Sequence, residues 1–335
     1  MGGMRIERLG LTTVLVLTLS LLTSGYDMFD DDNEYDDRMA STGATMRSVA
    51  RVVRSIATSD GAGVKLRRSL GTRALDSHDP FLMLDHFGSD DPDAYIAGFP
   101  DHPHRGFKTL TYMIEGQMNH KDSMGNKGRL SSGGLQLMTA GSGIIHSEMP
   151  AQSEGLMSGF QLWINLPAKD KMTDPNYQDI QPDQVPSIEL DSGAVVKLFA
   201  GSYGGHTGPV EDPHTHLFYV DVDLPAGQSI DLDVPSTHNV FVYAFDSGPL
   251  FIDGTQVDDD TLATLTGGDA VSVSASEADP TRFILVAGTP LNEPIARGGP
   301  IVMSTREEVM QAFADYQEGN FIKKVASGLD SLDAE

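Results

Sequence analysis

Two pairs of potential metal ligands give this sequence its clearest chemical signal. His102 and His104 are two residues apart, and so are His146 and Glu148. In an extended strand, residues i and i+2 point to the same face. Two such strands facing each other inside a barrel would therefore direct three imidazoles and one carboxylate to one point. Three nitrogens and one oxygen suit a divalent transition metal and leave coordination positions for substrate and dioxygen.

The remaining histidines fit this site less well. His86 and His120 lie close in sequence to the ligand strands. We interpret both as structural residues that line the pocket or orient a ligand without binding the metal. His214 and His216 repeat the H-x-H pattern, but no H-x-E follows them. We interpret this pair as part of a connection, with a weak surface metal site as the alternative. Candidate pocket walls, which at strand positions are more often plain core, are Tyr112, Met138, Met149, Phe160 and Trp163.

Short apolar segments separated by Gly, Pro, Asn and Asp must position these residues. Such spacing predicts antiparallel barrels or sandwiches rather than alternating strands and helices. A segment rich in Pro, Asp, Lys and Gln at 167–186 is the expected connector between two halves. The expected strands of the first half are 81–84, 108–114, 135–139 and 160–166, and those of the second are 195–199, 217–224, 239–245, 270–274 and 283–287.

The two halves also resemble each other. Residues 104–116 align without gaps on residues 236–248, and several apolar positions are in step. In this register His102 and His104 fall on Val234 and Ser236, and residues 270–287 offer no partner for His146. A duplicated barrel without metal ligands is therefore expected in the second half. The predicted domains are 46–170 with the metal site and 187–325 without it.

One helix is expected near the C-terminus. Ser304 and Thr305 precede Glu307 and Glu308 by three residues, which is a capping-box arrangement. Val309, Phe313 and Tyr316 share one helical face, and Gly319 can end the helix. We expect this helix to be a packing element and not a site.

Composition and charge exclude several classes of function. The 335-residue chain contains no cysteine, which rules out disulfides, thiolate metal sites and cysteine nucleophiles. Its 48 acidic and 23 basic residues give a net charge of −25. Such a surface repels nucleic-acid phosphates, so direct nucleic-acid binding is not expected. The excess of carboxylates is typical of adaptation to high salt, and a merely acidic protein is the alternative.

Residues 1–45 form a segment of their own. Arg5 and Arg8 precede an apolar run at 9–22, followed by an acidic stretch at 27–37. The run is short for a membrane span but has the length of a signal-peptide core, and the acidic stretch is typical of a disordered tether. We expect export to the periplasm or the outside of the cell. The alternative is translation from a later start near Met46 and a cytoplasmic protein.

With these residues in view, the chain resembles the pirin family of the cupin superfamily. The motifs that carry the resemblance span most of residues 47–325 and are LDHFG (84–88), HPHRGF (102–107), MIEG (113–116), GGLQLMTAGSGIIHSEMP (133–150), GFQLWINLP (159–167) and GPIVMSTREEVMQAFADYQ (299–317). The resemblance implies two antiparallel cupin (jelly-roll) barrels with one metal in the first. It maps the family's ligands onto His102, His104, His146 and Glu148. It also places Lys108 where many relatives carry an acidic or neutral residue, which implies a different charge near the pocket mouth.

The resemblance further implies quercetin 2,3-dioxygenase-like activity with one divalent metal. Fe(II) is the first expectation, and Mn, Ni, Cu and Zn are the alternatives. The expected partners are a flavonol-like aromatic substrate and dioxygen, with Glu148 accepting the proton of the flavonol hydroxyl as the catalytic base. The alternative is a non-catalytic, redox-sensitive, metal-binding regulatory or interaction protein. A monomer is expected, with a protein partner as a further alternative.

Overall fold

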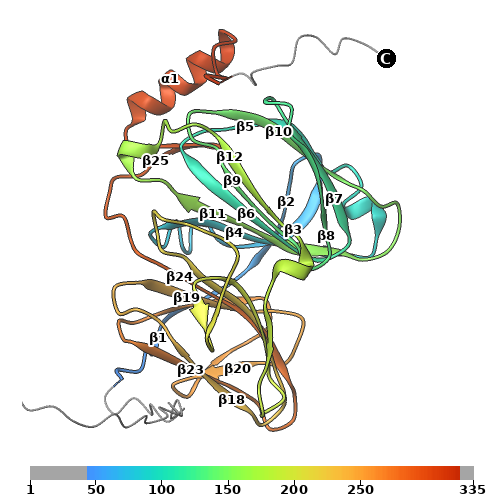
Figure 1. The fold of residues 1–335 in the computed structure, drawn as a ribbon, viewed down its shortest axis with the longest axis vertical. Coiled ribbons are helices and arrows are strands. Elements are labelled where there is room, and N and C mark those ends of the chain that lie inside the picture. The colour runs from blue at the N-terminus through green and yellow to red at the C-terminus, as the bar shows by residue number, and fades with distance from the viewer. Residues whose placement is uncertain (1–43, 325–335) are drawn as a thin grey trace, which may run out of the picture. The chain divides into compact units, whose positions relative to one another are not determined.

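Two similar sets of antiparallel strands make up residues 44–324, the part of the chain that this computed structural model describes (Figure 1). Each set joins a seven-stranded sheet to a four-stranded sheet, and all strand pairs within the sheets are antiparallel. The prediction of an all-β fold with two antiparallel barrels and one short helix is therefore confirmed. The predicted export signal and the acidic stretch at 27–37 lie outside the described residues. Within 44–324, no helix has the length and apolar character needed to cross a membrane.

The first barrel contains the larger part of the first half of the chain. Its seven-stranded sheet has the order β12 (Asn176–Ile180), β9 (Leu135–Thr139), β6 (Phe107–Glu115), β11 (Met157–Asn165), β4 (Phe81–Ser89), β3 (Val64–Leu70) and β2 (Ile56–Asp60). Its four-stranded sheet has the order β5 (Phe99–His104), β10 (Ile144–Pro150), β7 (Gln117–Asp122) and β8 (Lys127–Ser131).

The second barrel repeats this plan. Its seven-stranded sheet has the order β1 (Val49–Arg54), β22 (Thr261–Leu265), β19 (Asn239–Ala244), β24 (Thr281–Gly288), β17 (Phe218–Leu224), β14 (Val195–Ala200) and β13 (Ser187–Glu189). Its four-stranded sheet has the order β18 (Ser229–Asp233), β23 (Ala270–Ala275), β20 (Leu250–Ile252) and β21 (Thr255–Val257). Short hairpins are β15 (Ser202–Tyr203) with β16 (His206–Thr207) and β25 (Ala296–Gly298) with β26 (Ile301–Met303), and 3-10 turns cover Pro92–Ala94, Ala168–Asp170 and Pro182–Gln184.

One edge strand of each large sheet comes from a segment that was not predicted to belong to that barrel. Strand β1, at the start of the described chain, pairs with β22 in the sheet of the second barrel. The segment expected to be a plain connector contains β12, which pairs with β9 in the sheet of the first barrel. Pairing of this kind depends on contacts far apart in sequence, which local strand patterns do not encode.

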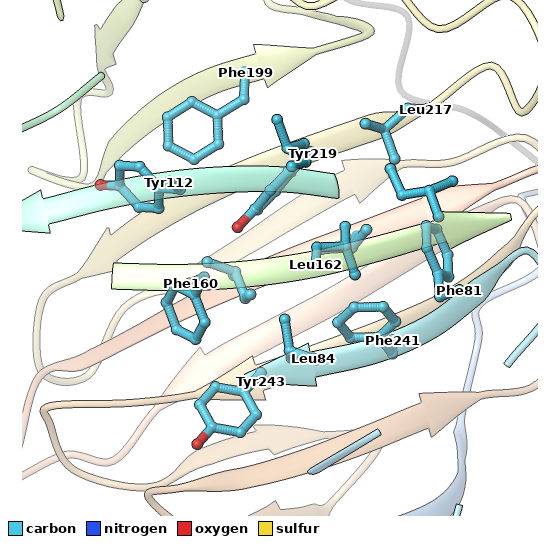
Figure 2. Packing of buried hydrophobic residues seen from close by; sticks show 14 of the residues in the cluster. Phe81, Leu84, Tyr112, Phe160, Leu162, Phe199, Leu217, Tyr219, Phe241 and Tyr243 are labelled. Atoms are coloured by element: carbon cyan, nitrogen blue, oxygen red, sulfur yellow. The ribbon is translucent and has the colours of Figure 1, made fainter. Parts of the chain in front are cut away.

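A large apolar core joins the two barrels. The central strands of the first large sheet are buried on both faces, and one face of β6 carries Leu110 and Tyr112 toward the second barrel. There Tyr112 packs on Phe199 with ring centroids 4.4 Å apart, and Phe81 meets Phe241 edge-on at 5.3 Å (Figure 2). Because this interface is a continuous hydrophobic cluster, the described residues form one compact unit.

The interior of the second barrel is filled with aliphatic side chains. In the first barrel β5 and β10 carry the predicted ligands, but β18 and β23 in the equivalent sheet positions carry buried Ile230, Leu232, Val271 and Val273. Val234, which aligns with His102, is also buried in this cluster. Among residues 44–324, the group of three mutually close metal-ligating side chains comes from the first barrel.

Helix α1 (Arg306–Gln317) begins as predicted. Thr305 caps it by accepting a hydrogen bond from the Glu308 amide at 3.2 Å, and the Glu308 carboxylate accepts one from the Thr305 amide at 2.9 Å. Of the three residues predicted to share one packing face, however, only Val309 is buried. Phe313 and Tyr316 are 41% and 44% exposed, and the buried residues are Val309, Ala312 and Asp315. Asp315 is turned inward because it accepts a 2.7 Å hydrogen bond from buried Arg105, which follows β5.

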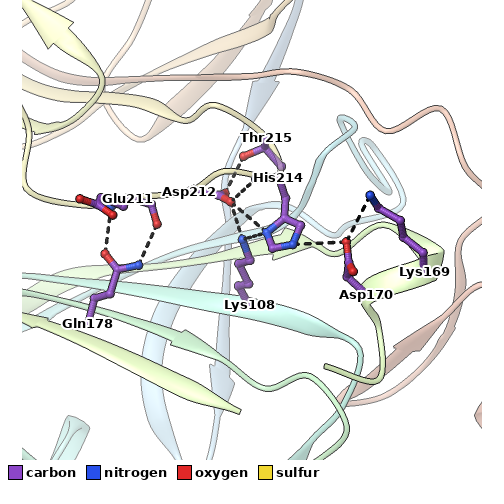
Figure 3. Close-up of polar contacts among 8 residues, drawn as sticks. All are labelled: Lys108, Lys169, Asp170, Gln178, Glu211, Asp212, His214 and Thr215. Carbon is purple, nitrogen blue, oxygen red and sulfur yellow. Dashed lines mark hydrogen bonds and ion pairs between the residues drawn. The ribbon is translucent and has the colours of Figure 1, made fainter. Parts of the chain in front are cut away.

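A buried polar network lies at a second contact between the barrels (Figure 3). The Lys108 ammonium on β6 is 2% exposed and pairs with Asp212, whose carboxylate also accepts a 2.6 Å hydrogen bond from Thr215. His214 contacts Lys108 through Nδ1 at 2.8 Å, and its Nε2 lies 3.4 Å from Asp170. The expectation that Lys108 changes the charge at the pocket mouth was therefore wrong, because its side chain points to the opposite face of the sheet.

Candidate metal centre

The predicted ligand pairs lie on two strands that are hydrogen-bonded neighbours. Strands β5 and β10 pair with His146 opposite His102 and Ile144 opposite His104. The strands do not face each other across the barrel, as the sequence argument assumed. The three histidines meet because they share one face of one sheet, where cross-strand neighbours lie close together.

The three imidazoles converge closely. Their ligand nitrogens all lie within 4.8 Å of one another, and the ring centroids of His102 and His146 are 4.4 Å apart. The Nε2 atoms of His102 and His104 are 3.0 Å apart. The Nδ1 of His102 lies 2.8 Å from the Pro100 carbonyl, to which a protonated Nδ1 donates. That bond leaves the Nε2 lone pair of His102 directed at the centre of the cluster.

The chemistry of these nitrogens fits a bound metal ion. Both ring nitrogens of His146 and the Nδ1 of His104 are buried without a hydrogen-bond partner among residues 44–324. Burial lowers the pKa of His104 and of His146 well below the usual value, and the neighbouring histidines lower it further. Neutral, unpartnered imidazoles are the form that coordinates a transition metal. The cluster therefore suggests a divalent metal site.

Glu148 lies beside this cluster, in the same cavity. It is 5% exposed, and a β-bulge between His146 and Glu148 shifts its register against β5. Burial raises the pKa of its carboxyl, whereas His102 and a hydrogen bond from Thr111 lower it. The Thr111 hydroxyl lies 3.4 Å from Glu148 Oε1. The group of mutually close ligands contains the three histidines alone, so Glu148 as a fourth ligand stays a prediction.

A cavity of about 540 Å³ opens at the cluster. This volume is in the range of pockets that bind small aromatic molecules. Its lining residues from the strands and the loops around the cluster are Asp60, Gly61, Ala62, Leu66, Arg68, Met83, Asp85, Phe87, Phe99, Pro100, Asp101, His102, His104, Met118, Glu148, Gln161, Trp163, Arg297, Gly299 and Pro300.

A row of polar residues that the sequence reasoning missed crosses the large sheet, and three of its members, Arg68, Asp85 and Gln161, line the cavity. One residue from each of six adjacent strands is aligned by the sheet register, in the order Arg68, Asp85, Gln161, Thr111, Gln136 and Asp179. Several flanking positions are apolar, as in the pairs Met83–Trp163 and Leu66–Phe87. A polar residue among apolar inward positions, as in β3 and β4, was a usable signal, but the row exists only once the register is known.

The residues predicted as candidate pocket walls lie in different parts of the structure. Trp163 lines the cavity, whereas Tyr112 and Phe160 point to the opposite face and belong to the core between the barrels. Met138 is buried in a small cluster inside the first barrel, and Met149 is partly buried without lining the cavity.

The predictions for the other histidines have different outcomes. His86 stacks on Phe160 at 4.6 Å on the far face of the sheet, so the expectation that it lines the metal pocket was wrong. His120 is paired across the strands with Glu148 and stacks on Tyr177. His214 belongs to the network between the barrels, as expected for a residue in a connection.

Models of known protein families match both barrels. The family model described as Pirin matches residues 63–164, and the model described as Pirin C-terminal cupin domain matches residues 219–322. A protein of Pseudomonas aeruginosa, provisionally named a quercetin 2,3-dioxygenase, is 48% identical over 268 residues, which cover 78% of this chain and 93% of that one. Human pirin is 39% identical over 276 residues, covering 81% and 92%.

A solved structure has the same fold. The crystal structure of a quercetin 2,3-dioxygenase from Acinetobacter baumannii superposes with a TM-score of 0.77 at 33% identity. The match covers 83% of this chain and 99% of that one.

Proposed function

Because the chain belongs to the pirin family of the cupin superfamily, we propose that it is a metal-dependent dioxygenase that opens flavonols such as quercetin. The observation that carries the proposal is the group of three converging histidines, of which His104 and His146 are buried, at a cavity of about 540 Å³. Similarity to the quercetin 2,3-dioxygenase of Acinetobacter baumannii supports the choice of substrate class.

The proposed cofactor is one divalent transition metal, with Fe(II) as the first choice. His102, His104 and His146 would hold it, with Glu148 as the proposed fourth ligand. A divalent ion in this site supplies Lewis acidity, which lowers the pKa of a substrate hydroxyl bound beside it.

The chain itself has three tasks in this reaction. The Glu148 carboxylate accepts the proton of the flavonol 3-hydroxyl, and the Thr111 hydroxyl beside Oε1 holds that carboxylate in place. Phe87 and Trp163 give the cavity aromatic walls that suit a planar ligand. Burial of His104, His146 and Glu148 keeps water from the reacting end.

Oxygen uptake by the metal-loaded protein with quercetin tests this proposal. The wild type is expected to consume oxygen and release carbon monoxide as the flavonol ring opens. The His102→Ala/Glu148→Ala double variant should show neither, whereas His206→Ala, which changes an exposed histidine on β16, should behave as the wild type. Metal retention by the wild type without oxygen uptake would favour the alternative, a metal-binding regulatory or interaction protein.

We also propose that the protein is an exported monomer. The basic and apolar pattern of the first 25 residues supports export. Mass spectrometry of the mature N-terminus from the native source tests it, because an intact N-terminus would contradict cleavage. Light scattering tests the monomer, which a mass of twice 36.0 kDa would contradict.

A further inference from the structure

Two arginines line the cavity, and their partners differ. Arg68 donates hydrogen bonds of 2.6 Å to both carboxylate oxygens of Asp85 and one of 2.8 Å to Asp60. Arg297 has no carboxylate within 4.0 Å among the residues that the structure describes. It donates to the Leu82 carbonyl at 3.3 Å and lies 3.6 Å from the Met83 sulfur, which is a weak acceptor. Most of its five N–H groups therefore remain available to a ligand.

The Arg297 guanidinium is also held in place. It lies 4.9 Å from the centre of the Trp163 ring, and the His104 ring meets Trp163 edge to face at a centroid distance of 5.3 Å. Its strand β25 packs closely against helix α1. A Cβ added at Gly298 of this strand would lie only 2.6 Å from the Val309 side chain of the helix. A cation held in this way loses little conformational entropy when a ligand binds.

Among the described residues, the carboxylates around the cavity do not contact the Arg297 guanidinium directly. Asp60 and Asp85 are both bound to Arg68, and Asp101 lies 3.8 Å from Lys121. Asp76, Asp85 and Asp60 act on Arg297 only from beyond contact distance, and Arg68 opposes them as a like charge. The position is therefore suited to one additional negative group.

We propose that Arg297 determines specificity in this cavity by binding an anionic group, such as a carboxylate or phenolate, on a planar aromatic ligand. The other end of the ligand lies at the three histidines. Arg297 and the His104 ring are within about 10 Å of each other through Trp163, a span that a three-ring flavonol can cover. The aromatic nature of the ligand rests on the proposed function.

Anaerobic binding of two probes tests this inference without requiring turnover. The probes are 3-hydroxyflavone and the same compound with a carboxylate on its phenyl ring, titrated calorimetrically into metal-loaded protein under argon. The wild type is expected to bind the carboxylate about tenfold or more tightly than the parent compound, which is the effect of one charge-assisted hydrogen-bonded pair. A net charge of −25 would by itself disfavour the anion, so such a preference must be local.

Three variants locate the effect. Arg297→Gln should abolish the preference, and Arg297→Lys should retain part of it, because lysine keeps the charge but not the stacked planar fork. Arg129→Gln removes an exposed arginine outside the cavity and should leave the preference unchanged. If Arg297→Gln does not fold, the lysine variant still decides the matter.

The inference is overturned if the wild type shows no preference, or if the Arg297 variants keep the full preference. This result is distinct from failure of the proposed function, which would appear as absent oxygen uptake in air whatever the binding preference.

Discussion

At the scale of single residues, the geometry of the histidines favours a shared cation. His102 and His104 direct their Nε2 atoms at each other across 3.0 Å, and the buried His146 has no hydrogen-bond partner in the described chain. Neutral imidazoles arranged in this way bring acceptor lone pairs together, which is unfavourable without a proton or a metal between them. His102, His104 and His146 would hold a divalent metal through these nitrogens.

Glu148→Gln should remove the proton acceptor without changing the shape of the cavity. The amide has nearly the same volume as the carboxylate but cannot accept the flavonol proton. We expect kcat for oxygen uptake to fall by about 10² to 10⁴ at saturating metal, the usual contribution of a general base. Metal analysis of the same sample is the control. A variant with full metal content and unchanged kcat would show that Glu148 is not the base.

At the scale of elements, the turn between β5 and β6 depends on a glycine. Gly106 has φ +87°, and a Cβ there would lie 2.0 Å from the Val302 carbonyl oxygen. This close contact brings hairpin β25–β26 next to the strand that carries His102 and His104.

Gly106→Ala is therefore expected to destabilise the fold. The left-handed conformation and the clash together should lower the free energy of unfolding by about 1–3 kcal/mol or more. Gly254→Ala is the matched control, because its φ is +72° but nothing lies within 4 Å of the added Cβ. Urea unfolding of both variants measures the difference, and equal losses would show that the Val302 contact has no effect.

The buried pair of Lys108 and Asp212 links an element of each barrel. Lys108→Met would leave the Asp212 carboxylate buried without its cation, and we expect a loss of about 3–5 kcal/mol in the free energy of unfolding. The double variant Lys108→Met/Asp212→Leu removes both charges and should recover most of this loss. Denaturant unfolding of the single and double variants measures the coupling, and additive losses would contradict it.

At the scale of the whole molecule, carboxylates between the packed elements set the response to acid. Burial acts to raise the pKa of Asp212, but hydrogen bonds from His214, Lys108 and Thr215 hold it below the ordinary value. Hydrogen bonds from Arg105 and Gln311 likewise lower the pKa of Asp315. A depressed pKa in the folded state means that the unfolded chain binds more protons in acid.

Stability is therefore expected to be complete above pH of about 4, the ordinary carboxyl pKa, and to fall as the pH decreases below it. Urea unfolding at pH 6, 4 and 3 measures this slope. Asp315→Asn should already be less stable at pH 6 and should show a shallower decrease. The same slope in the variant and the wild type would exclude Asp315 as a source of the acid sensitivity.

The net charge of −25 is also a property of the whole molecule. Repulsion among carboxylates is screened by salt, so thermal stability should rise between 0.1 and 2 M KCl if the surface is adapted to high salt. A melting temperature that is highest in dilute buffer would contradict this adaptation.

The local features of the molecule were determined by the sequence itself. The i, i+2 spacing placed His102 with His104 on one face of a strand, and every expected strand is present. The capping box at Thr305 also depends only on neighbouring residues. These features could be predicted because strand alternation and helix capping are set within a few residues.

Only the tertiary structure decided which face and which partner each element uses. Strand β6 is buried on both faces, so its alternation could not show that Tyr112 faces the second barrel and Thr111 faces the cavity. The pairing of β1 with β22, and the position of Arg297 in the cavity of the first barrel, depend on contacts more than 150 residues apart. Packing between distant segments selects these arrangements, and no local pattern of residue types specifies them.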